Sequence, residues 1–170
     1  IKEQVFGPIG GERYADYICD IQNSGKHLLD LINDVLDVSA IEAGMLDLHE
    51  EPCSISSIVK DALSIIQPAA ENNDIQLKTD FDDSIPMLRV DIRRIKQILL
   101  NLLSNSAKFT EKGGHILVRT SWSETGEPIL RVSDTGIGMT QQEIIMAMSQ
   151  FGQVDTGFGR KHEGTGLGLP

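Results

Sequence analysis

The stretch DIRRIKQILLNLLSNSAKFT, residues 91–110, decides the fold because it predicts one helix with two different faces. At about 100° per residue, Asn101, Asn105 and Lys108 project together, away from the centre of the apolar face. Asp91 is suited to cap the start of the helix, and Gly113-Gly114 marks the break after it. The apolar face is a stripe at helical spacing that consists of Ile95, Ile98, Leu99, Leu102 and Leu103.

The polar face of this helix carries two amides and an ammonium group, with no carboxylate among them. An amide oxygen can ligate Mg²⁺, and a lysine supplies a point charge for phosphate oxygens. The combination suits a metal-bound polyphosphate. For this helix taken alone, a solvated polar face is the plainer interpretation.

Composition excludes several classes of function. The chain has 170 residues, 40% of them apolar, and a net charge of −10 from 15 basic and 25 acidic residues. No basic block appears, so nucleic-acid binding is disfavoured. No run is long enough to span a bilayer, and two cysteines without metal-ligand spacing are compatible with reducing cytosol. Because the chain opens on Ile1 and stops just after a glycine cluster, we expect a fragment.

The first part of the chain predicts a helical hairpin. Residues 1–6 resemble the tail of one helix, residues 7–11 contain Gly and Pro that interrupt it, and a long helix follows over residues 12–42. Its apolar residues alternate in steps of four and three, a seam that requires partner helices. Two hairpins would form a four-helix bundle, so we expect a homodimer. The alternative is a hairpin packed on its own domain.

We place the domain boundary between residues 1–45 and 46–170, at a connector with an expected edge strand over 46–49. The second domain alternates helical and strand patterns, which predicts an α+β fold. We expect helices over 54–71, 91–110 and 141–148, strands over 75–81, 88–90, 115–121 and 129–133, and a mobile glycine-rich loop over 149–168.

Four short motifs stand in order along this second domain. They are Asn101-x3-Asn105-x2-Lys108, Asp134-Thr-Gly-Ile-Gly138, Phe151-Gly152 and Gly164-Thr-Gly-Leu-Gly168. An acceptor such as Asp134 after a strand suits the exocyclic amine of a purine, and glycines allow the main chain to approach a ring or a phosphate. Each glycine cluster alone is explained equally by a plain turn.

Together, the four motifs resemble the N, G1, F and G2 boxes of sensor histidine kinases, and residues 14–44 resemble the second helix of that family's dimerisation and phosphotransfer hairpin. The turn FGPIGGERY is similar to that of the alphaproteobacterial kinases that control development. The resemblance implies a helical hairpin, half of a dimeric bundle, followed by an α/β sandwich of the kind shared with DNA gyrase, MutL and heat-shock chaperone ATPases. We expect the sandwich to be truncated at its C-terminus and the first hairpin helix to be mostly missing.

The resemblance also implies ATP and Mg²⁺ as cofactors. Asn105 would ligate the metal, Asn101 and Lys108 would reach the phosphates, and Asp134 would bind the adenine amine. The other implied ATP contacts are Phe109, Gly136 and Gly138 in the pocket, Phe151, Arg160 and Lys161 in the lid, and Gly164, Thr165, Gly166, Leu167 and Gly168. For Arg160 and Lys161, an exposed and solvated side chain is an equally good explanation.

The implied activity is transfer of the ATP γ-phosphoryl group to a histidine and onward to a response regulator, in the cytoplasm or in the cytosolic part of a membrane-bound sensor. Related ATPases have a water-activating glutamate where this chain has Asn101, and an amide cannot take a proton from water. No acceptor-histidine motif is present, so we expect the fragment itself to lack the catalytic histidine, and His27 is not expected to act as the acceptor. His162 lies in the implied lid, where a solvated side chain is a plainer interpretation than a phosphate contact. The alternative is a non-catalytic, pseudokinase-like dimeric module that binds a response regulator; a water-splitting ATPase is disfavoured by Asn101.

Overall fold

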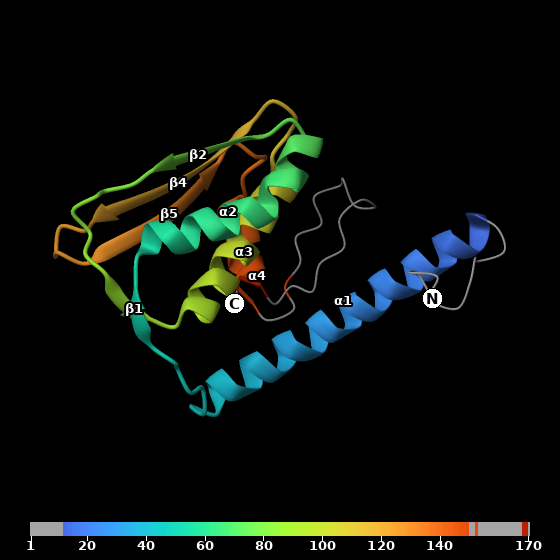
Figure 1. The fold of residues 1–170 in the computed structure, drawn as a ribbon, viewed down its shortest axis with the longest axis horizontal. Coiled ribbons are helices and arrows are strands. Elements are labelled where there is room, and N and C mark those ends of the chain that lie inside the picture. Colours follow the sequence, from blue (N-terminus) through green and yellow to red (C-terminus); the bar gives the residue numbers. More distant parts are fainter. Residues whose placement is uncertain (1–11, 150–151, 153–167, 170) are drawn as a thin grey trace. The chain divides into compact units, whose positions relative to one another are not determined.

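The computed structural model describes residues 12–149, 152, 168 and 169, and it divides the chain into two compact units, Ile1–Leu46 and Asp47–Pro170 (Figure 1). Each unit has its own architecture. None of the described helices is long and apolar enough to cross a bilayer.

The first unit contains one long helix, α1 (Glu12–Glu42), of 31 residues. Its end is closed by Gly44, which has a φ of +64°. The N–H of Met45 donates to the Ala40 carbonyl and the N–H of Gly44 to the Ile41 carbonyl, which is the Schellman arrangement that satisfies the last carbonyls of a helix. Large apolar side chains remain exposed along α1: Tyr14, Tyr17, Ile21, Leu28, Leu29, Ile32, Val35, Leu36 and Ile41.

The second unit is a layer of two helices on a three-stranded sheet, with a small two-stranded sheet and a short helix beside them (Figure 1). In the larger sheet, β2 lies parallel to β4, and β4 lies antiparallel to β5; in the smaller one, β1 pairs antiparallel with β3. The elements are β1 (Glu51–Cys53), α2 (Ile55–Asn72), β2 (Gln76–Asp80), β3 (Leu88–Val90), α3 (Ile92–Phe109), β4 (His115–Trp122), β5 (Pro128–Asp134) and α4 (Gln141–Ala147).

One hydrophobic core lies between α2, α3 and one face of the larger sheet. On β4, Ile116, Val118 and Thr120 are buried, so every second residue points toward the helices. The other core residues are Cys53, Ile58, Val59, Ala62, Leu63, Ile66, Ala70, Ile75, Leu99, Leu103 and Ala107. The α+β fold predicted for this part of the chain is therefore confirmed.

Two details of the prediction were wrong. Ile98 does not belong to the buried stripe of α3, because its side chain is 54% exposed; the buried row runs through Leu99, Leu103 and Ser106 instead. Residues 46–49 form no strand, and β1 begins only at Glu51. The N–H of His49 donates to a carboxylate oxygen of Asp91, not to a strand neighbour.

Candidate functional site

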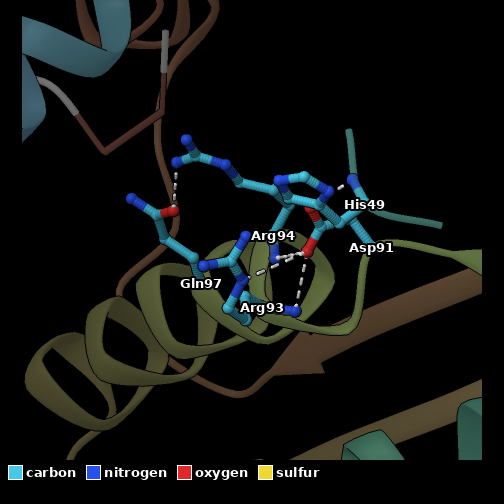
Figure 2. A network of polar contacts seen from close by, with 5 residues as sticks. All are labelled: His49, Asp91, Arg93, Arg94 and Gln97. Carbon is cyan, nitrogen blue, oxygen red and sulfur yellow. Dashed lines mark hydrogen bonds and ion pairs between the residues drawn. The ribbon is translucent and has the colours of Figure 1, made fainter. Parts of the chain in front are cut away.

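The start of α3 is held by a buried carboxylate, Asp91, which is 6% exposed. Its Oδ1 accepts hydrogen bonds from the N–H groups of Arg93 at 3.0 Å and Arg94 at 3.2 Å, and its Oδ2 accepts from the N–H of His49 at 3.1 Å (Figure 2). These bonds, that of His49 first, lower the pKa of Asp91. The ionised carboxylate therefore caps the helix and fixes the connector that precedes β1.

The polar face predicted on α3 is half-buried. Asn101, Asn105 and Lys108 all have intermediate exposure. The Lys108 Nζ lies 5.1 Å from the centre of the Phe109 ring, which is within the range of a cation–π contact. Burial lowers the pKa of Lys108, because the charged ammonium loses hydration. An anion beside this group would recover part of that lost stabilisation.

The strand register directs Asp134 toward α3. Asp134 lies directly opposite Ile116 in the antiparallel pair of β5 and β4. Side chains that are directly opposite lie on the same face of a sheet, and the Ile116 face is the one buried under the helices. Accordingly, the Ser106 Oγ of α3 donates a hydrogen bond to Asp134 Oδ2 at 3.0 Å. Asp134 is thus tied to the residue that follows Asn105.

The loop after Asp134 packs on the end of α3. The N–H of Gly136 donates to Asp134 Oδ1 at 2.9 Å, and the N–H of Ile137 donates to the Phe109 carbonyl at 3.3 Å. A Cβ on Gly136 would lie 2.6 Å from that carbonyl oxygen, so no side chain fits there. Gly138 has open space but a φ of +68°, a conformation that glycine adopts without strain.

Two more glycines of the predicted motifs are described. Gly168 lies against the Asn101 side chain, since a Cβ on it would be 3.7 Å from the amide carbon and nitrogen. Gly152 follows α4, and its N–H donates to the Ser149 carbonyl at 2.8 Å. A Cβ on Gly152 would overlap the Met146 carbonyl oxygen. A capping box of Thr140 and Glu143 starts α4.

The described site residues therefore follow one helix. Gly168 meets α3 at Asn101, Asp134 meets it at Ser106, and the Gly136 loop meets it at Phe109, a span of about 12 Å along the helix axis. Asn105 and Lys108 lie between and beside these points on the same helix. Predicted positions outside the described residues are Phe151, Arg160, Lys161, His162, Gly164, Thr165, Gly166 and Leu167, and the side chain of His27.

Sequence reasoning missed Ser106. A signal was available, because residues 99, 103 and 106 are spaced by four and three and therefore share one face of a helix. A serine in an otherwise apolar row needs a hydrogen-bond partner from outside the row. An open groove of about 540 Å³, lined by Leu48, His49, Glu50, Glu51 and Arg89, contains none of the predicted site residues.

The second unit is thus a mixed sheet backed by helices, with a glycine loop packed on the end of the helix that carries Asn101, Asn105 and Lys108. Residues 90–170 match the family of histidine kinase-, DNA gyrase B- and HSP90-like ATPases. Over these residues the chain is similar to that family, and the relatives and solved structures that it clearly resembles are histidine kinases.

Curated relatives agree with the expected likeness to kinases that control development. The chain is 44% identical over 178 residues to the cell-division control histidine kinase PdhS of Brucella suis and to that of Brucella anthropi. The alignments cover 100% of this chain and 17% of each relative. The chain therefore spans about a sixth of the length of the curated relatives it matches.

Solved structures of histidine kinases share the fold. Full-length ShkA in complex with AMPPNP has a TM-score of 0.81 and 29% identity, over 98% of this chain and 34% of that one. The mycobacterial sensor histidine kinase MprB has a TM-score of 0.58 and 25% identity, over 71% and 74%. Acinetobacter baumannii AdeS, at 20% identity and a TM-score of 0.68 over 81% and 67%, supports the fold alone.

Proposed function

We propose that this chain is the ATP-binding catalytic part of a two-component histidine kinase, which moves the γ-phosphoryl group of ATP to a histidine and onward to a response regulator. One observation carries the proposal: Asp134 and its glycine loop are bonded to the same helix, α3, that presents Asn101, Asn105 and Lys108. An acceptor for a base amine and donors for phosphates thus lie along one rigid element. Such positioning is the main requirement of phosphoryl transfer.

The residues fit ATP at both ends. Adenine would stack against a loop whose main chain can come close, because Gly136 has no side chain, and its exocyclic amine would donate to Asp134. The phosphates would lie toward Asn105, Asn101 and Lys108. The predicted contacts of Phe109, Gly138 and Gly168, and of the lid residues 151 and 160–168, belong to the same proposal.

The donor set also fits Mg²⁺ bound together with the nucleotide. Among the described residues, no group of three or more His, Cys, Asp or Glu is placed to hold a metal ion by itself. Mg²⁺ takes few protein ligands and completes its octahedron with phosphate oxygens and water, so one amide oxygen of Asn105 suffices. When bound, the metal would neutralise charge on the phosphates.

Asn101 favours phosphoryl transfer to a histidine over hydrolysis by water. The amide has no basic group to take a proton from water, so water attack on the γ-phosphorus lacks a general base. In the proposed transfer, a histidine nitrogen forms a bond to the γ-phosphorus, the bond from that phosphorus to the β–γ bridging oxygen breaks, and ADP leaves. The same phosphoryl group would then pass to the response regulator.

Residues 1–45 would form the dimerisation and phosphotransfer part, and residues 46–170 the ATP-binding part. The long row of exposed apolar side chains on α1 supports a homodimer, because such a row is stable in water only when another helix covers it.

Titration of the 170-residue chain with AMPPNP and Mg²⁺ tests the binding step. We expect saturable binding that Asn105→Ala weakens more than tenfold, and negligible steady ATP hydrolysis. Label transfer from ATP to a separately supplied protein that carries the histidine tests the kinase step. Binding without transfer would favour the pseudokinase-like dimeric module, and rapid hydrolysis that Asn105→Ala abolishes would favour a water-splitting ATPase.

A further inference from the structure

Ser106 is a polar residue in the apolar row of α3. It is 7% exposed and shares its face of the helix with Leu99 and Leu103, both fully buried. A buried hydroxyl without a partner destabilises a core, so a serine here requires a specific bond. Its main-chain carbonyl accepts the N–H of Thr110 at 3.0 Å, as in a regular helix.

The hydroxyl bonds outside its own helix. Helical serines commonly donate to a carbonyl one turn back. Among the described helices, three serines do so: Ser39 to Val35 at 2.8 Å, Ser64 to Asp61 at 2.7 Å and Ser104 to Asn101 at 3.1 Å. The Ser106 Oγ donates instead to Asp134 Oδ2 at 3.0 Å. The bond joins groups 28 positions apart in the chain, and it is charge-assisted because Asp134 is a carboxylate.

With this bond, both oxygens of Asp134 have a protein donor, since the N–H of Gly136 donates to Oδ1 at 2.9 Å. Two bonds from different elements set the orientation of the carboxylate, although Asp134 itself is exposed. Each oxygen keeps a second lone pair that can accept from a ligand. A carboxylate already in its binding orientation spares the ligand the entropy of ordering it.

We propose that Ser106 is a positioning residue that holds the Asp134 carboxylate ready for the exocyclic amine of adenine and so contributes to base selection. This inference rests on the proposed function, in which Asp134 is the acceptor of that amine. The hydroxyl acts through Asp134. Its removal should therefore weaken binding only of nucleotides that use the amine.

The test compares two nucleotides on the 170-residue chain by calorimetric titration with Mg²⁺. AMPPNP carries the amine, and inosine triphosphate has a carbonyl oxygen in its place. Ser106→Ala should weaken AMPPNP binding by about 3- to 10-fold, the equivalent of one hydrogen bond, and leave inosine triphosphate binding unchanged. Ser104→Ala is the matched control on the same helix, exposed and bonded within it, and should leave the ratio of the two affinities as in the unsubstituted chain.

Ser106→Thr and Ser106→Val form a second pair of equal shape. Threonine keeps the hydroxyl and should retain more of the preference for AMPPNP than valine does, even if both variants are less stable. A chain that binds no nucleotide would refute the proposed function itself. The role of Ser106 alone would be overturned by a different result. In that result Asp134→Asn loses the preference for AMPPNP, whereas Ser106→Ala and Ser106→Val keep it.

Discussion

Gly136 is the position at which one added methyl group should separate the glycine loop from α3. A Cβ there would lie 2.6 Å from the Phe109 carbonyl oxygen and 2.8 Å from Asp134 Oδ1, where ordinary contacts begin at 3.4 Å. The loop must therefore move by about 0.8 Å, because neither the helix end nor the strand end yields easily. The bond from Ile137 to Phe109, already 3.3 Å long, would not survive that movement.

The expected loss is about 2–4 kcal/mol in the free energy of unfolding of the second unit. Overpacking contributes about 1–3 kcal/mol and the broken hydrogen bond about 0.5–1.5 kcal/mol. Trp122, the only tryptophan in the sequence, lies on β4 of this unit, so its fluorescence in urea reports the relevant transition. A loss of this size corresponds to a midpoint lower by roughly 1–2 M urea.

Gly138 provides the contrast, because it has space for a side chain but an unfavourable φ of +68°. Gly138→Ala should lose only about 1–2 kcal/mol, and Gly138→Asn less, since asparagine tolerates this conformation. At Gly136, asparagine should be no better than alanine, because the obstacle there is steric. A Gly136→Ala variant that unfolds within 0.5 kcal/mol of the unsubstituted chain would refute the packing of this loop on α3.

Two further predictions concern α3. Leu103→Ala should destabilise the second unit by about 2–5 kcal/mol in urea, because Leu103 is fully buried, whereas half-buried Leu102→Ala should lose clearly less; equal losses would contradict the assignment of the buried row. The lowered pKa of Asp91 means that its carboxylate binds a proton more weakly in the folded state than in the unfolded state. The ionised carboxylate of Asp91 therefore stabilises the fold above the unfolded pKa of about 3.9, and this stabilisation is lost as the pH falls through the lower pKa of the folded state. Unfolding followed by Trp122 fluorescence from pH 7 to pH 3 gives the difference in stability between the unsubstituted chain and Asp91→Asn. This difference should stay level to about pH 5 and shrink below about pH 4. A difference that is constant over the whole pH range would show that the bond from His49 does not persist in solution.

Local patterns of the sequence determined most of the secondary structure. The helix over residues 92–109 was predicted because apolar spacing, an N-cap and a following glycine pair all fall within one short window. The strands His115–Trp122 and Pro128–Asp134 were predicted within one residue at each end, since alternation is also a local signal. The order of the motifs was sufficient to indicate the family.

Tertiary structure decided which face of α3 is buried and what Asp134 contacts. The spacing of apolar residues along α3 predicted a buried stripe that included Ile98. In the structure, packing against α2 and the sheet buries the row through Leu99, Leu103 and Ser106 instead. The bond from Ser106 to Asp134 depends on the register that sets Asp134 opposite Ile116, and the bond from His49 to Asp91 spans 42 positions. Periodicity within a window encodes how a segment coils, but it carries no information about which distant group meets it, because that is settled only when strands pair and helices pack.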